Sequence, residues 1–241
     1  GVQSMNDGIL VDAKRGHTAR DVVEAVARLQ QRGMTVGVQL LPGLKGETWE
    51  SILETAIAVV KMKPDFVRIY PVLVIENTEL ADQYRAGEYE PLSTEQAITY
   101  CAFLKDWFER HNIEVIRTGL QSTEELDSGN SLVAGPYEPA MGELVVNEQY
   151  KQRIECCIKE HIESFIDKEL SQWNIWGQAN NYIALNISVF YPRSLTSKVR
   201  GLKNRNMLYF QEKYPHININ WYEDSTRNTV RCCIDGLQYV L

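Results

Sequence analysis

Strand-like and helix-like hydrophobic spacings alternate along the first 120 residues of the chain. β-Rich runs at 35–41, 66–70 and 113–117 are separated by helical patterns that begin near Thr48 and Ser93. Strands that are joined by helices form right-handed βαβ units and a parallel sheet rather than an antiparallel sandwich. The first part of the chain is therefore predicted to be α/β.

The pattern changes after this region. Residues 119–142 are rich in Gly, Ser, Pro and acidic residues, which predicts a long irregular connection. Helical spacing then runs from about Met141 to Trp173, and the rest has the pattern of a small α+β domain. In that domain, strands are predicted at 182–189, 217–221 and 229–234, and a mostly helical basic stretch at 197–213. We therefore divide the chain into 1–145, a helical connector at 146–175, and a small domain at 176–241.

Charge is distributed unevenly. Residues 1–150 contain 13 Lys and Arg against 23 Asp and Glu, whereas residues 151–241 contain 12 against 9. Of the two parts, only the second has a balance that favours a polyanion such as RNA.

The cysteines indicate a reducing compartment. Four of the five cysteines form two adjacent pairs, Cys156-Cys157 and Cys232-Cys233. Neighbouring cysteines rarely form a structural disulfide, and side chains of adjacent residues diverge. We expect free thiols, one buried residue in each pair, no metal site, and a cytoplasmic protein. No apolar run has the length of a membrane span, so no membrane partner is expected, and the sequence does not indicate an oligomeric state.

Polar side chains stand at the predicted carboxyl ends of strands, where ligands of parallel sheets collect. Gln3, Gln39, Tyr70 and Arg117 occupy such positions. Gln39 interrupts an apolar strand, and its amide would bond either a ligand or a neighbouring loop. Arg15 follows a short helix-like stretch and would contact either a ligand or a surface carboxylate.

A glycine-containing turn, Pro42-Gly43-Leu44-Lys45-Gly46-Glu47, follows the strand of Gln39 and precedes a helix. Glycines let the backbone approach a ligand closely, and a helix N-terminus offers free amides to an anion. The spacing differs from that of a P-loop. The turn is therefore predicted to lie beside a bound ligand, although such loops also contain glycine for geometric reasons alone.

An ordered set of short motifs resembles the second half of a radical S-adenosylmethionine (SAM) enzyme barrel. The motifs are GVQS at 1–4, KRGHT at 14–18, LPGLKGE at 41–47, KPDFVRIYP at 63–71, VIENTEL at 74–80, GEY at 87–89 and VAGPY at 133–137. The subgroup resembled unites the Elongator catalytic subunit with relatives of oxygen-independent coproporphyrinogen III oxidase. The resemblance covers about residues 1–145 and implies the C-terminal half of a partial TIM-like barrel.

The resemblance implies a [4Fe–4S] cluster held by a C-x3-C-x2-C loop, with SAM bound to its open iron. Electron transfer, from a donor such as flavodoxin or ferredoxin, would split SAM into methionine and a 5′-deoxyadenosyl radical that abstracts hydrogen from the substrate. None of the five cysteines has that spacing. We therefore expect the chain to be the later part of a longer protein, and this part alone to be unable to cleave SAM.

The same resemblance assigns residue roles. It places Gln3 beside the methionine or ribose of SAM, Arg15 at its carboxylate or ribose, and Gln39 at its ribose hydroxyls, where relatives often carry an acidic side chain. The backbone of Val72 and Leu73 would contact the adenine, and Tyr70 would face the substrate.

The last part of the chain resembles a KH-type RNA-binding module, which clamps a nucleic-acid backbone with a GXXG loop between two helices. Gly201-Leu202-Lys203-Asn204 would form this loop, because Asn tolerates a positive φ better than most residues. Lys198, Arg200, Lys203 and Arg205 would contact phosphates of an RNA, with tRNA as the candidate. The alternative is a basic helix that serves packing or dimerisation.

Three functions remain open at this point. The first is part of a radical SAM enzyme with an unknown substrate, possible substrates including tRNA. The second is an RNA-binding module with a non-catalytic barrel as scaffold. The third, a TIM-barrel hydrolase or aldolase, would need paired carboxylates or a lysine with a base at strand ends, and we find none. The acetyltransferase domain of the Elongator subunit is not recognisable after residue 145, so acetyl transfer is not inferred.

Overall fold

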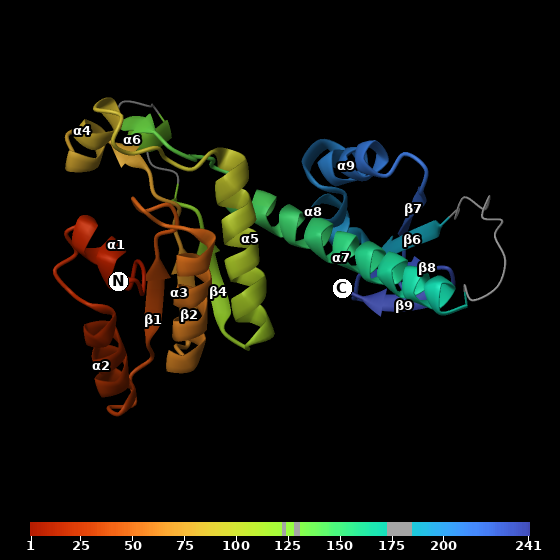
Figure 1. Cartoon of the computed structure of the whole chain (residues 1–241), viewed down its shortest axis with the longest axis horizontal. Coiled ribbons are helices and arrows are strands. Elements are labelled where there is room, and N and C mark those ends of the chain that lie inside the picture. The colour runs from red at the N-terminus through yellow and green to blue at the C-terminus, as the bar shows by residue number, and fades with distance from the viewer. Residues whose placement is uncertain (122–123, 128–130, 173–184) are drawn as a thin grey trace. The chain divides into compact units, whose positions relative to one another are not determined.

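The computed structural model describes residues 1–121, 124–127, 131–172 and 185–241. The chain divides into two compact units, Gly1–Val145 and Val146–Leu241 (Figure 1). Each unit has its own hydrophobic core.

The first unit is built on a three-stranded parallel sheet of β1 (Gly37–Leu40), β2 (Phe66–Ile69) and β4 (Glu114–Thr118), in the order β1-β2-β4. Gln3 forms a parallel bridge with Leu40 at the outer edge of β1. Parallel strands joined through helices confirm the predicted α/β class.

Three helices cover this sheet: α2 (Ala19–Gln30), α3 (Trp49–Met62) and α5 (Thr94–Arg110). Each begins at a capping box, in which the side chain of Thr18, Thr48 or Ser93 accepts a hydrogen bond from the backbone three residues on. Residues spaced three or four positions apart along two of these helices are buried in the first core: Ile52, Ala56 and Val59 of α3, and Ala97, Cys101, Leu104 and Phe108 of α5. Local patterns thus predicted these helices closely.

Short elements between the main ones were harder to predict. They are α1 (Asp7–Asp12), β3 (Val74–Ile75), α4 (Glu79–Arg85), α6 (Glu124–Asp127) and β5 (Leu132–Ala134). β5 pairs antiparallel with β3, so the prediction that 119–142 is entirely irregular was wrong. The pairing joins residues about 60 positions apart, as Val74 with Ala134, and no local pattern announces it.

The second unit contains a four-stranded mixed sheet in the order β7-β6-β8-β9. Its elements are α7 (Met141–Gln172), which begins just before the unit boundary, β6 (Asn186–Tyr191), α8 (Thr196–Arg200), α9 (Arg205–Lys213), β7 (Asn218–Glu223), β8 (Arg231–Ile234) and β9 (Leu237–Val240). Short 3-10 turns at Arg193–Leu195 and Leu202–Asn204 flank α8. The expected domain boundary near residue 175 and the predicted strand residues 182–184 lie outside the described residues.

One face of this sheet packs against the helices. Ile154 and Ile158 of α7, Val199 of α8 and Phe210 of α9 form a core with side chains of the strands. Cys157 and Cys232 are buried while Cys156 is exposed and Cys233 half-buried, and all five cysteines are free. Within the described ranges, no helix is long and apolar enough to cross a membrane.

Candidate functional site

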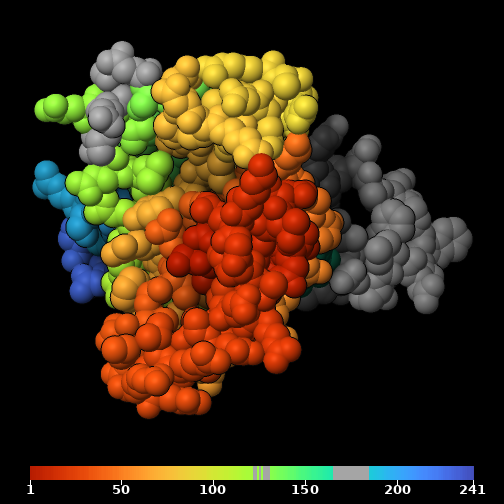
Figure 2. Space-filling model, turned by 90° about the vertical axis from the view of Figure 1, so that its left-hand side faces the viewer, coloured from red at the N-terminus to blue at the C-terminus, as the bar shows by residue number. Residues whose placement is uncertain are grey.

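A cavity of about 490 Å³ lies beside the carboxyl ends of β1 and β2. Its walls come from the end of α1, the ends of the two strands, the chain after β2 and the start of α4. In Figure 2 the red residues of the N-terminus and α1 lie below the yellow residues that include α4. A volume of this size is typical of a small-molecule site, and its position is where parallel sheets bind ligands.

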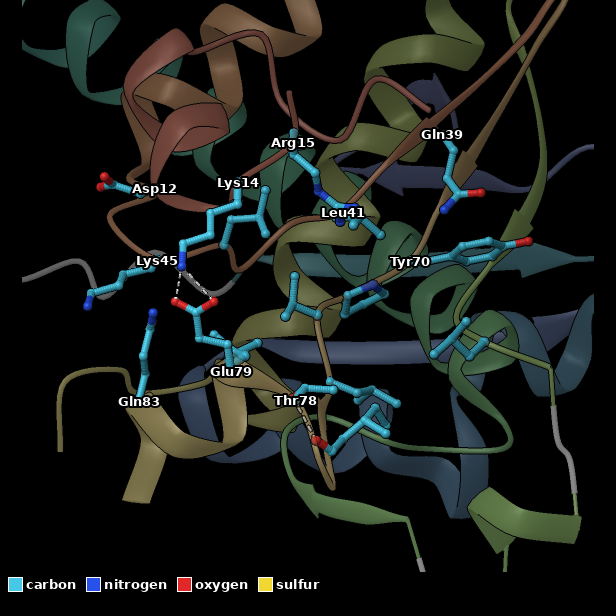
Figure 3. Close-up of a pocket in the computed structure, with 18 residues that line it drawn as sticks. Asp12, Lys14, Arg15, Gln39, Leu41, Lys45, Tyr70, Thr78, Glu79 and Gln83 are labelled. Atoms are coloured by element: carbon cyan, nitrogen blue, oxygen red, sulfur yellow. Dashed lines mark hydrogen bonds and ion pairs between the residues drawn. The ribbon is translucent and has the colours of Figure 1, made fainter. Parts of the chain in front are cut away.

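Five of the six predicted SAM and substrate residues line this one cavity: Arg15, Gln39, Tyr70, Val72 and Leu73. They come from segments far apart in the sequence and meet because the carboxyl ends of parallel strands lie at one edge of the sheet. Figure 3 shows Arg15, Gln39 and Tyr70 toward one end of the cavity.

The polar groups of this set have no partner within the described part of the chain. No ion pair includes Arg15, and the side chains of Gln39 and Tyr70 make no hydrogen bond there. The two alternatives considered for these residues, a surface ion pair for Arg15 and a bond to a neighbouring loop for Gln39, are therefore not seen among these residues. The Arg15 guanidinium and the Gln39 amide are therefore available to a ligand in the cavity.

Gln3 lies apart from this set and is not among the residues that line the cavity. Its backbone has a left-handed φ of 61° and bridges to Leu40. The side-chain amide folds back on the start of the chain and, oriented as a donor, lies 3.1 Å from the carbonyl oxygen of Gly1. Arg117, the fourth strand-end residue, instead donates to the Gln121 Oε1 at 3.0 Å.

The Val72–Leu73 backbone is held closely on two sides. The N–H of Val72 donates to the Pro42 carbonyl at 2.9 Å. On the other side, Gly135 has a φ of 110°, and a Cβ there would come within 3.1 Å of the Val72 carbonyl oxygen and 3.2 Å of the Leu73 Cα. Only glycine adopts this backbone without strain, so Gly135 permits the close approach that shapes this wall.

The glycine-containing turn is closed by a carboxylate of its own chain. Glu47 accepts a hydrogen bond from the Gly43 N–H at 2.6 Å, and the Tyr89 hydroxyl donates to the Gly43 carbonyl at 2.7 Å. Burial raises the pKa of Glu47 to about 7 although the amides of Gly43 and Leu44 oppose the shift, and burial also raises the pKa of Tyr89 to about 12.

The Gly43 amide of this turn is thus engaged within the chain. Sequence reasoning missed Glu47 and Tyr89; the only signal for Glu47 was a carboxylate four residues after a turn glycine, within reach of that glycine's amide.

Charged residues form the other end of the cavity. The Lys14 Nζ donates to both carboxylate oxygens of Glu79, at 2.6 and 2.8 Å, and so joins the end of α1 to the start of α4 (Figure 3). The hydrogen bond from Lys14 lowers the pKa of Glu79. The Lys45 Nζ lies 3.7 Å from the Glu88 Oε2, and the two form an ion pair. The exposed Lys14–Glu79 pair marks the rim of the cavity.

The residues present fit SAM but not an iron–sulfur cluster. Arg15 suits a carboxylate, Gln39 suits hydroxyls, and the apolar Val72–Leu73 wall suits a purine ring. No cysteine lines the cavity. Among the described residues, no group of three or more His, Cys, Asp and Glu side chains is arranged to hold a metal ion.

The predicted RNA-contacting loop of the second unit lies between α8 and α9, as expected. Gly201, Lys203 and Asn204 all have positive φ, of 78°, 53° and 61°. Lys198, Lys203 and Arg205 are exposed. Arg200 instead donates through Nε to the Tyr191 hydroxyl and lies over that ring, 5.5 Å from its centroid. Arg200 is therefore engaged with a buried side chain of the core.

Two asparagines that the sequence reasoning did not single out position this loop. The Asn147 Nδ2 donates to the carbonyls of Ser197 and Lys198 at 3.1 and 3.2 Å, and its Oδ1 accepts from the Leu202 N–H at 3.0 Å. The Asn206 Nδ2 donates to the carbonyls of Asn147 and Val199 at 2.8 and 3.1 Å. The end of α8 thus finds its hydrogen-bond partners in buried amides.

The first unit is an α/β domain of parallel strands with a cavity at the carboxyl ends of β1 and β2. Comparison with known proteins identifies the barrel. Residues 64–152 match the model of the Radical_SAM C-terminal domain. The chain is 34% identical over 163 residues to the tRNA uridine(34) acetyltransferase of Methanocaldococcus jannaschii, covering 66% of this chain and 29% of that protein. It is 32% identical over 96 residues to Elongator complex protein 3 of Danio rerio, covering 39% of this chain and 18% of that protein.

A solved structure supports the partial barrel predicted for the first unit. The archaeal Elp3 of Methanocaldococcus infernus, with an N-terminal deletion, has a TM-score of 0.54 and 32% identity to this chain, covering 63% of this chain and 35% of that one. The chain is a relative of the radical SAM proteins of the Elongator type, which confirms the Elongator side of the resemblance. It spans 29% of the length of the M. jannaschii relative.

Proposed function

We propose that this chain forms the SAM- and substrate-facing wall of a radical SAM enzyme that modifies tRNA. The observation that carries the proposal is the meeting of Arg15, Gln39 and the Val72–Leu73 backbone in one cavity, with the polar groups unpartnered in the described part of the chain. Relatives named as tRNA uridine(34) acetyltransferases support tRNA as the substrate class.

The chemistry of each side chain supports a particular role. The Arg15 guanidinium binds the carboxylate of SAM as a charge-assisted donor, and the Gln39 amide bonds the ribose hydroxyls. The Val72–Leu73 backbone holds the adenine, with Gly135 behind it. Tyr70, at the end of β2, orients the substrate. These residues bind and orient; none of them needs to transfer a proton.

The proposed cofactors are SAM and a [4Fe–4S] cluster, with a flavodoxin- or ferredoxin-like electron donor. Together they supply a radical that removes a hydrogen atom from the substrate. Protein ligands for the cluster are not provided by the five cysteines of this chain, which lack the C-x3-C-x2-C spacing. The free thiols support a cytoplasmic location.

Equilibrium binding of SAM tests the cavity. By isothermal titration calorimetry, Arg15→Met is expected to weaken SAM binding about tenfold or more, because a charge-assisted hydrogen bond is lost. Arg20→Met, at an exposed arginine of α2 outside the cavity, is the matched control and should bind as the unchanged chain does. Equal affinities of the two variants would refute the assigned role of Arg15, and absence of SAM binding by the unchanged chain would refute the proposed site.

We further propose that the second unit contacts the phosphates of tRNA through the Gly201–Asn204 loop and the exposed Lys198, Lys203 and Arg205. Gly201→Asp combined with Lys203→Glu is expected to lower tRNA affinity, since it places negative charge in the loop and removes a phosphate contact. Filter binding measures this effect. Unchanged affinity would remove the loop from the interface. A chain that binds tRNA but not SAM would instead favour the non-catalytic scaffold.

A further inference from the structure

Among the described residues, the helices of the second unit pack against one face of its four-stranded sheet, and the core residues lie on that face. Along β6, Ile187, Val189 and Tyr191 are buried in the core with the helices. Because side chains alternate between the faces of a sheet, Asn186, Ser188 and Phe190 point to the opposite side. We call this side the open face, and the strand register shows which residues of the other strands share it.

An aromatic row crosses three strands of the open face. Phe190 of β6 lies beside Tyr222 of β7 and Arg231 of β8 in the register. The rings of Phe190 and Tyr222 are stacked, with centroids 5.3 Å apart and an interplanar angle of 22°. On the side of Phe190 away from Tyr222, the Arg231 guanidinium carbon of β8 lies 5.5 Å from the centroid of the Phe190 ring. Tyr222 ends this row on β7 and is 47% exposed.

A polar row runs parallel to it, two residues along each strand. Ser188 is flanked by Asn220 of β7 and Cys233 of β8, and Cys233 is paired in turn with Gln238 of β9. The amides and the hydroxyl both donate and accept hydrogen bonds, which suits the edges of bases. None of the four is a carboxylate, so the row does not repel a polyanion.

Arg231 adds an anchored positive charge with an unused donor. It is only 8% exposed, and its Nη2 forms an ion pair with Asp224. Its Nε is buried and has no hydrogen-bond partner within the described residues. Residues 185–241, the part of the unit that carries the sheet, are basic, with eight Lys and Arg against four Asp and Glu. Exposed Arg193 and Arg227 follow β6 and β7 at the same end of the sheet as the aromatic row.

We propose that the open face binds an unpaired stretch of RNA, with one base stacked on the outer side of Tyr222 and neighbouring bases bonded by the polar row. Stacking on aromatic side chains requires bases that are free of a duplex, so a double helix does not fit this face. The inference rests on the RNA substrate of the proposed function but adds a second, separate surface to the Gly201–Asn204 loop, which would hold phosphates.

Fluorescence anisotropy with the whole chain and a labelled single-stranded RNA of about ten nucleotides tests this surface. Tyr222→Ala is expected to weaken binding about tenfold, because one stacked base loses its platform. Tyr222→Phe should restore binding, since stacking needs the ring and not the hydroxyl. The matched control is Tyr84→Ala, which removes an exposed tyrosine of the first unit and should have no effect. The same RNA annealed to its complement should bind more weakly than the single strand.

Several results would overturn the inference: equal binding by Tyr222→Ala and the unchanged chain, failure of Tyr222→Phe to restore binding, or no binding of the single strand. Circular dichroism monitors folding, and Phe190→Leu is a second variant that keeps an apolar residue while removing the ring. If only the loop variant Gly201→Asp with Lys203→Glu loses RNA binding, the open face is refuted and the proposed function stands. If SAM binding fails while the Tyr222 effect remains, the proposed SAM site is refuted and the open face stands.

Discussion

The two units place their polar side chains in different ways. In the first, Arg15, Gln39 and Tyr70 come from separate segments and surround a cavity at the ends of parallel strands. In the second, Asn147 and Asn206 are buried, and their side-chain amides form hydrogen bonds with the backbone around α8. A polar group that is unpartnered beside a cavity is available to a ligand, whereas a buried and fully bonded one supports the fold. The two sites therefore respond to mutation differently.

The largest effect is expected in the second unit, from Asn206→Asp. This change removes the donor that serves two buried carbonyls and places a carboxylate against them, so we expect a loss on the order of 3 kcal/mol in the free energy of unfolding. Hydrogen exchange should rise in 186–241 and stay unchanged in 1–121. Asn218→Asp, at an exposed residue of β7, is the matched control. If both variants are equally stable, Asn206 does not hold the loop.

A smaller loss is expected in the first unit from Gly135→Ala. The added Cβ meets the backbone of Val72 and Leu73, and the φ of 110° is strained for alanine, so about 2 kcal/mol should be lost together with SAM affinity. Gly87→Ala is the control, because Gly87 also has a positive φ but open space around it. Urea denaturation and calorimetry compare the two. Equal effects would show that backbone strain alone, and not close approach, explains the glycine.

The pH dependence of stability sharpens the comparison further. The pKa of Glu47 rises from 4.5 to about 7 on folding, so the folded state binds the proton more tightly. Its contribution to stability is therefore present at low pH and is lost as pH rises from about 4.5 to 7. Glu47→Gln keeps an acceptor for the Gly43 N–H and should remove this loss, making the variant more stable above pH 7 by on the order of 1–2 kcal/mol.

Urea denaturation of Glu47→Gln at a series of pH values measures this difference. Glu54→Gln, at an exposed carboxyl of α3, is the matched control. A difference between Glu47→Gln and the unchanged chain that does not vary with pH would contradict the assignment.

The smallest effect is expected at the rim of the cavity. The side chains of Lys14 and Glu79 are 70% and 56% exposed, and exposed ion pairs contribute little to stability. Glu79→Gln should therefore leave the melting temperature unchanged at both low and high salt. A clear drop in melting temperature would make this pair a structural link between α1 and α4, and so part of what shapes the cavity.

Local patterns in the sequence predicted much of this architecture. Thr18, Thr48 and Ser93 are N-caps whose contacts reach only three residues along the chain. The buried faces of α3 and α5 follow from the spacing of their hydrophobic residues. The positive φ at Gly201 and Asn204 also agrees with their residue types, since few residue types tolerate positive φ. Strand ends in a predicted parallel sheet indicated where Gln39 and Tyr70 would meet.

Other features depend on contacts between distant parts of the chain. The β3–β5 pairing, the inward fold of the Gln3 amide and the place of Asn206 beneath α8 required the complete fold. So did the open face, because the order β7-β6-β8-β9 places Phe190 between Tyr222 and Arg231, which come more than thirty residues later in the sequence. Caps and periodicity act within a few residues, whereas strand pairing and burial are decided by which distant segments come together.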